Sequence, residues 1–241
     1  MNKIDIVITM AGLSSRFKDV GYTVPKYMIK AKGKTLFEWS LLSLKNYKER
    51  TNQYIFLALK EENIQVENFI KDQCSKLGIE NYKIIIINEP TDGQATTAML
   101  ARNYWIENNS LLIYNIDTYV ELDALKIEDI KGDGYIPCFK AEGTHWSFVR
   151  LNDKNEVCEI KEKEKISDNC TIGAYYFKTC KLFENLYNEF YLKNNDNIEK
   201  YVAPLYNHLL NKGGQIYISN IEANKVHVLG TPKELETFIN V

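Results

Sequence analysis

Residues 4–10 constrain the fold of this chain more than any other segment. They read Ile-Asp-Ile-Val-Ile-Thr-Met and run directly into the loop Ala-Gly-Leu-Ser-Ser-Arg at residues 11–16, and Pro25 and Lys26 follow the loop. An apolar run of this length predicts a strand buried on both faces. The small loop residues let backbone N–H groups approach phosphate oxygens, and Arg16 and Lys26 supply positive charge. The segment therefore predicts a site for a nucleoside triphosphate.

Strand and helix patterns alternate through the rest of the first half. Further strands are predicted at residues 54–59, 83–88 and 111–116, with helices at 35–47, 62–77 and 96–106. Such alternation predicts a layered α/β sheet with crossover helices. An open sheet of this kind binds ligands beyond the carboxyl ends of its strands, and the loop at residues 11–16 leaves the first strand at that edge.

The second half is built differently, from short strand-like segments separated by turn residues. Its predicted strands are 135–140, 146–152, 157–161, 171–177, 215–221 and 226–230, and its predicted helices are 180–192, 202–211 and one from Pro232. With 241 residues, 45% of them hydrophobic, the chain is large enough for one substantial core and short for two. We therefore expect a single domain.

Charge and cysteine content exclude several classes of protein. The formal net charge is −2 and the acidic and basic residues are interspersed, so no basic face indicates nucleic acid. The five cysteines are odd in number and scattered, which favours reduced thiols over a disulfide framework or a zinc site. No apolar run approaches the roughly 20 residues of a membrane span, and no signal peptide is evident. We expect a cytoplasmic protein that binds neither membrane nor nucleic acid.

The first motif has a counterpart in a known family. The order strand, Ala-Gly-x-Ser-Ser-Arg, spacer, Pro-Lys resembles the signature of the sugar-phosphate nucleotidyltransferases, the pyrophosphorylases that make nucleotide-activated sugars. In that family the loop wraps the triphosphate, and the arginine and lysine neutralise it as pyrophosphate departs. The resemblance implies nucleotide-binding roles for Ala11, Gly12, Leu13, Ser14 and Ser15 and catalytic roles for Arg16 and Lys26.

This motif departs from the family pattern at one position. Ser14 stands where the family usually has a second glycine, so it needs a backbone conformation that tolerates a Cβ. The alternative interpretation is an ordinary turn from strand to helix, with both cations merely solvated.

A carboxylate ends the apolar strand at residues 111–116. Magnesium takes hard oxygen ligands, often only one or two of them from protein, so Asp117 suits a metal that bridges phosphates. The segment resembles the family element that binds Mg²⁺ and nucleotide, which implies a metal role for Asp117 and a nucleotide role for Asn115. Alternatively, Asp117 starts a turn. Val228 stands where many relatives carry a second aspartate, which leaves Glu222, Asn224, His227, substrate phosphates or water to complete the metal shell.

Residues 88–98 resemble the family segment that contacts the nucleobase. The run is dense in hydrogen-bonding groups without bulk, as recognition of a base edge requires. The candidates are Asn88, Glu89, Gly93 and Gln94. A second interpretation, compatible with the first, is that Thr91 or Asp92 caps the following helix and Gly93 permits the turn.

Two later segments resemble the region that holds the phosphorylated acceptor, the molecule that attacks the triphosphate. In the family a Glu-Lys pair binds acceptor hydroxyls and the acceptor phosphate, which implies these roles for Glu162 and Lys163, with Gly173 in the same region. Alone, alternating Glu and Lys indicate an exposed strand face. Residues 201–207, Tyr-Val-Ala-Pro-Leu-Tyr-Asn, resemble a branch associated with capsule and surface-polysaccharide gene clusters, where this segment shapes the acceptor pocket.

The resemblance extends over nearly the whole chain. It implies a single-domain, Rossmann-like (GT-A-like) α/β/α sandwich with a mixed central sheet, with a nucleotide-binding half over about residues 1–120 and an acceptor-binding half over about 121–241. It also implies a Mg²⁺-dependent transfer from an NTP to a sugar 1-phosphate or a similar phosphorylated acceptor. Two other functions stay open: a glycosyltransferase of related fold, and a nucleotide-binding regulatory module without catalysis. Neither the base, the acceptor nor the oligomeric state is predicted.

Overall fold

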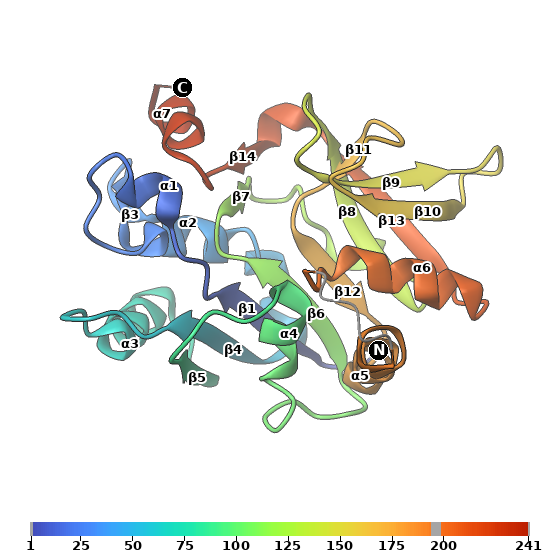
Figure 1. Cartoon of the computed structure of the whole chain (residues 1–241), viewed down its shortest axis with the longest axis horizontal. Coiled ribbons are helices and arrows are strands. Elements are labelled where there is room, and N and C mark those ends of the chain that lie inside the picture. The colour runs from blue at the N-terminus through green and yellow to red at the C-terminus, as the bar shows by residue number, and fades with distance from the viewer. Residues whose placement is uncertain (1, 194–198, 241) are drawn as a thin grey trace.

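A ten-stranded mixed sheet forms the centre of the computed structural model, which describes residues 2–193 and 199–240. Its strands are β1 (Ile4–Met10), β4 (Thr51–Leu59), β5 (Tyr82–Ile87), β6 (Ser110–Asn115), β8 (Gly134–Lys140), β9 (Ser147–Leu151), β10 (Val157–Glu162), β11 (Asn169–Thr171), β12 (Ala174–Phe177) and β13 (Ile216–Ile221). They lie in the order β10-β9-β11-β8-β12-β6-β1-β4-β5, with β13 paired to β8 (Figure 1). The strands β6, β1, β4 and β5 run parallel, whereas β12 joins β6 antiparallel. The predicted mixed sheet is confirmed.

Helices cover both faces of this sheet, and others pack beside it. They are α1 (Ser15–Lys18), α2 (Leu36–Leu42), α3 (Val66–Leu77), α4 (Gln94–Met99), α5 (Cys180–Tyr187), α6 (Ala203–Asn211) and α7 (Pro232–Asn240). Alternation along β1 explains the layers, because Ile6 and Ile8 pack with Phe37 of α2, whereas Val7 points to the other face and packs with Ala98 of α4 and Phe183 of α5. The predicted α/β/α sandwich is thereby confirmed.

Shorter elements connect these layers. Two small strand pairs are β2 (Lys30–Ala31) with β3 (Lys34–Thr35), and β7 (Thr118–Val120) with β14 (Val226–Val228). The short 3-10 helices are η1 (Lys26–Met28), η2 (Lys45–Arg50), η3 (Ile127–Asp129) and η5 (Ala223–Lys225), and η4 (Asn188–Leu192) is a short π-helix.

Several elements differ from the sequence-based expectation: the helix predicted at 35–47, for example, ends at Leu42. Two other differences bear on the site. The helix predicted at 96–106 ends at Met99, and the residues after it form tight turns until the N–H of Ile106 donates to Asp5. The strand predicted at 171–177 divides into β11 and β12, because Gly173 between them has φ +79°, which breaks the extended backbone.

Asp5 is a fully buried carboxylate on β1 whose oxygens are saturated by hydrogen bonds. Side-chain amides of Asn52, Gln53 and Asn109 donate to it at 2.8, 3.0 and 3.1 Å, and the N–H of Ile106 donates at 2.9 Å. These bonds fasten the start of β1 to β4 and to the segment before β6. The charge is tolerated in the core because every neighbouring donor points at it.

We expect Asp5→Ala to lower the free energy of unfolding by about 3 kcal/mol, because four donors around a buried carboxylate, among them the buried amide of Gln53, lose their acceptor at once. Urea denaturation followed by circular dichroism measures the change. Asp72, exposed on α3, offers a matched control, and Asp72→Ala should change stability by less than about 0.5 kcal/mol. Equal stability of the two variants would contradict the assigned role of Asp5.

Neither a disulfide nor a membrane-spanning helix contributes to this fold. All five cysteines are free, and four of them are buried. Within residues 2–193 and 199–240, no helix has both the length and the apolar character needed to cross a bilayer.

Candidate active site

A cavity of about 540 Å³ lies at the carboxyl ends of β1 and β6. It extends from the loop after β1 to the start of β9 and the end of β10, so it reaches residues of both predicted halves. The predicted site residues that line it are Ala11, Gly12, Leu13, Arg16, Lys26, Gly93, Gln94, Asn115, Asp117, Glu162 and Gly173. Ligand binding at this edge is typical of open α/β sheets.

The loop after β1 is held in shape by Ser14. This residue has φ 56° and ψ 26°, in the left-handed region that normally favours glycine. Its hydroxyl oxygen accepts a hydrogen bond from the backbone N–H of Lys26 at 3.1 Å, which offsets the conformational cost. Ser14 therefore sets the backbone conformation of the loop and links it to Lys26, without lining the cavity itself. Gly12 and Leu13 line the cavity.

An ion pair forms part of the cavity lining. The Lys26 Nζ is 2.6 Å from Asp117 Oδ2, and the two side chains are only 18% and 23% exposed. Lys26 begins η1 directly after Pro25, whereas Asp117 follows β6, so the contact joins residues 91 positions apart. Arg16, at the start of α1, lines the same cavity and adds a second cation. The arrangement concentrates charge suited to phosphate oxygens.

A second carboxylate lies beside Asp117. A Cβ built on Gly230 would be 3.1 Å from Asp117 Oδ2 and 3.6 Å from Glu234 Oε2, so both carboxylates border the same point. Glu234 lines the cavity from the first turn of α7, whose Leu235 and Phe238 pack with Phe17 of α1. Carboxylate oxygens are the ligands that a hard cation such as Mg²⁺ takes, and here one of them, Asp117 Oδ2, is paired with the Lys26 ammonium.

The start of α4 forms the wall of the cavity that is predicted to contact the base, here called the base-side wall. The Gln94 amide donates to Thr9 Oγ1 at 3.1 Å and also to Asn115 Oδ1, which orients both side chains. Gly93 is in close contact with another part of the chain, since a Cβ there would lie 2.4 Å from the carbonyl oxygen of Lys200. Backbone bonds complete the contact, with Lys200 N–H donating to Asp92 O at 2.8 Å and Ala95 N–H donating to Lys200 O at 2.9 Å.

A chain of hydroxyl groups supports Glu162 on the side of the cavity that is predicted to hold the acceptor, here called the acceptor side. The Ser147 hydroxyl donates to the Glu162 carboxylate and lies 3.0 Å from the Tyr175 hydroxyl, which in turn lies 3.0 Å from Thr171 Oγ1. All four side chains line the cavity. Burial raises the pKa of Glu162, and the hydrogen bond from Ser147 opposes that rise. The geometry suits recognition of ligand hydroxyls.

Lys163 lies at the rim of this side. It has φ 56°, and its N–H donates to Trp146 O at 2.8 Å. Its ammonium donates to the Tyr201 hydroxyl and lies 3.9 Å from a Glu199 oxygen. The bond with Tyr201 raises the pKa of Lys163, so its positive charge is favoured. Tyr201 and Glu199 line the cavity, so Lys163 reaches it through them.

Comparison with known proteins identifies the family. No protein-family model matches the chain. The crystal structure of a nucleoside-diphosphate-sugar pyrophosphorylase from Vibrio cholerae RC9 has a TM-score of 0.86 and 32% sequence identity, over 98% of this chain and 100% of that one. The chain belongs to the sugar-phosphate nucleotidyltransferases.

More distant relatives share the fold. The inositol-1-phosphate CTP transferase from T. maritima has a TM-score of 0.78 at 14% identity, over 100% of this chain and 97% of that one. A Sulfolobus acidocaldarius protein described as a mannose-1-phosphate guanyltransferase is 23% identical over 182 residues, 73% of this chain. That match spans 48% of the relative, so the chain covers about half its length.

Some residues predicted from the nucleotidyltransferase resemblance lie outside the cavity lining. They are Ser14, Ser15, Asn88, Glu89 and Lys163. The suggested substitutes for a second metal ligand, Glu222, Asn224 and His227, are also absent from the described lining. His227 instead lies 3.2 Å from Glu121 and stacks on Tyr119.

Sequence reasoning missed Glu199 and Glu234, which both line the cavity. Thr231 and Glu234 fit the S/T-x-x-E pattern of a helix start, and Thr231 Oγ1 accepts the N–H of Glu234 at 3.2 Å. That pattern explained Glu234 locally and gave no reason to connect it with Asp117. Nothing in the sequence distinguishes Glu199 from other surface carboxylates.

Proposed function

We propose that this chain is a Mg²⁺-dependent sugar-phosphate nucleotidyltransferase. It transfers a nucleotidyl group from an NTP to a sugar 1-phosphate, or to a similar phosphorylated acceptor, and releases pyrophosphate. The cytoplasm, where these substrates occur, is its expected location, and capsule or surface-polysaccharide synthesis its expected pathway. One observation supports this most strongly: the same cavity is lined by the cations after β1, by Asp117 after β6 and by Glu162 with its hydroxyl network.

The reaction needs no nucleophile from the protein. An acceptor phosphate is already an anion at neutral pH, so its oxygen attacks the α-phosphorus of the NTP while the bond to the β-phosphate oxygen breaks and pyrophosphate leaves. Catalysis then consists of positioning and charge stabilisation. Arg16 and Lys26 would stabilise the α-phosphoryl group and the departing pyrophosphate. Lys163 would align the attacking phosphate, and Glu162 would accept hydrogen bonds from acceptor hydroxyls.

The oxygen ligands at this edge of the sheet fit the magnesium that the family implies. Asp117 and Glu234 border a common point beside Gly230, and Mg²⁺ commonly takes one or two carboxylates together with phosphate oxygens and water. No group of three or more acidic, histidine or cysteine ligands occurs among the described residues, so substrate phosphates would supply the rest. Bound there, the ion would neutralise phosphate charge.

The first experiment measures pyrophosphate release with Mg²⁺. ATP, GTP, CTP, UTP and dTTP are each tested against a pooled panel of sugar 1-phosphates and small phosphorylated alcohols, and products are identified by mass. We expect acceptor-dependent pyrophosphate from at least one pair and its loss with EDTA. Nucleoside diphosphate released from nucleotide sugars would support a glycosyltransferase instead. NTP binding without turnover would support a regulatory module.

A further inference from the structure

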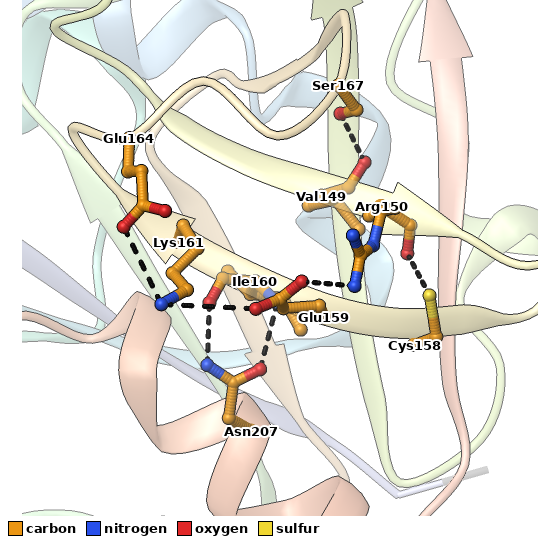
Figure 2. A network of polar contacts seen from close by, with 9 residues as sticks. All are labelled: Val149, Arg150, Cys158, Glu159, Ile160, Lys161, Glu164, Ser167 and Asn207. Atoms are coloured by element: carbon orange, nitrogen blue, oxygen red, sulfur yellow. Dashed lines mark hydrogen bonds and ion pairs between the residues drawn. The ribbon is translucent and has the colours of Figure 1, made fainter.

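Asn207 joins helix α6 to strand β10 through two hydrogen bonds to one residue. Its Nδ2 donates to the carbonyl oxygen of Ile160 at 2.6 Å, and its Oδ1 accepts from the N–H of Ile160 at 2.8 Å (Figure 2). An amide that pairs with both backbone groups of a residue imitates a neighbouring strand. Because β10 is an end strand of the described sheet, Asn207 occupies the position of the next strand.

The two elements that Asn207 joins carry walls of the acceptor side. Glu162 is the last residue of β10, two positions after Ile160, whereas Tyr201 and Val202 immediately precede α6. All three of these flanking residues line the cavity. The position of α6 on β10 therefore sets the distance between Glu162 and the segment before α6.

That segment is also attached to the base side. Lys200 exchanges backbone hydrogen bonds with Asp92 and Ala95, on either side of Gly93. A continuous set of contacts thus runs from the base-side wall through Lys200 and α6 to Asn207, and from there to Ile160 and Glu162. In this set of contacts, the hydrogen bonds of Asn207 connect α6 to β10, the strand that carries Glu162.

The other polar contacts near Asn207 do not fasten α6 to β10. Arg150 and Glu159 join β9 to β10, and Lys161 contacts Glu159 and Glu164 of its own segment, so Asn207 is the only α6 residue among those labelled (Figure 2). Lys163 bridges the walls at the rim, but its side chain is 55% exposed, and exposed pairs of this kind fix geometry weakly. Ile160, in contrast, is fully buried.

We propose that Asn207 is a positioning residue for the acceptor. Through its paired bonds to Ile160 it holds Glu162 at the distance from the nucleotide that in-line attack requires. Asn207 is given no contact with the substrates, because both polar atoms of its side chain are bonded to Ile160 and it is not among the residues that line the cavity. The inference rests on the proposed transferase function.

The test is Asn207→Leu, which preserves approximate size and removes both bonds. We expect kcat/KM for the acceptor to fall about tenfold, chiefly through acceptor KM, while KM for the NTP stays within about twofold. The control is Asn46→Leu, which removes an amide bond to Leu125 O, 3.1 Å long, outside the cavity. It should leave both KM values unchanged, because loss of an amide–backbone bond elsewhere does not move Glu162.

A second variant covers the case in which Asn207→Leu fails to fold. Asn207→Asp keeps the shape and the acceptor for the Ile160 N–H but turns an oxygen toward the Ile160 carbonyl, so it should raise acceptor KM in the same direction. A folded Asn207 variant with unchanged acceptor KM, or with both KM values raised equally, would overturn the inference. If the wild-type chain releases no pyrophosphate from any pair, the proposed function fails, and this inference with it.

Discussion

Replacing Lys26 with alanine is expected to lower kcat for pyrophosphate release by about 100- to 1000-fold while the protein still folds. Lys26 places its ammonium 2.6 Å from Asp117, in a cavity where both side chains are largely shielded from water. In the proposed reaction a cation held there would stabilise negative charge as it moves onto the departing pyrophosphate, whereas water that replaced it would not be preorganised. The turnover rate with saturating substrates measures kcat, and a circular dichroism spectrum shows whether the variant folds.

Lys18 provides the matched control for this change. It lies at the end of α1, in the segment between the loop and Lys26, but its side chain is 43% exposed and pairs with Glu61 at 3.3 Å. Lys18→Ala should therefore keep kcat within about twofold of the wild type. Wild-type turnover in the Lys26→Ala protein would remove Lys26 from the mechanism.

The second large effect is expected at Gly93. Gly93→Ala should lower the free energy of unfolding by about 2–4 kcal/mol, because the new methyl group collides with backbone and the local conformation suits only glycine. A Cβ there would lie 2.4 Å from the carbonyl oxygen of Lys200 and 2.5 Å from its nitrogen, and the residue has φ +149°. Neither backbone can retreat without breaking the bonds between Lys200 and its neighbours Asp92 and Ala95.

Gly78 provides a control that distinguishes the effect of steric collision from the effect of backbone strain. It also has a positive φ, +63°, as the residue after α3, but nothing lies within 4 Å of a Cβ built on it. Gly78→Ala should cost only about 1 kcal/mol, from the left-handed conformation alone. Chemical denaturation of both variants gives the comparison, and equal losses would mean that Lys200 adjusts to the methyl group at little cost.

The fold was predictable where short-range patterns determine it. The strand at residues 4–10 was predicted with its observed bounds, because a buried parallel strand is apolar on both faces and needs no information from elsewhere in the chain. The cavity at the end of this strand follows from the same pattern, since parallel strands direct their carboxyl ends to one edge.

The remaining features depend on contacts between distant segments. Glu234 approaches Asp117 because α7 packs on α1, and a helix-start pattern carries no information about that packing. Gly93 was predicted to contact the base, but its tightest contact is with Lys200, 107 positions later. Lys163 was predicted from its resemblance to the family's Glu-Lys pair, whereas its link to the cavity runs through Tyr201. The catalytic and binding roles assigned to these residues stay predictions.

The junction between β6 and β12 has a consequence for engineering. These strands pair antiparallel, with Tyr114 opposite Ala174 and Ile113 opposite Tyr175, so one sheet continues from the parallel strands into the acceptor side. A chimera that exchanges acceptor segments between relatives cannot simply cut the chain near its midpoint. It has to preserve this register, because a slip of one residue would turn Tyr175 away from the cavity and remove the hydroxyl network behind Glu162.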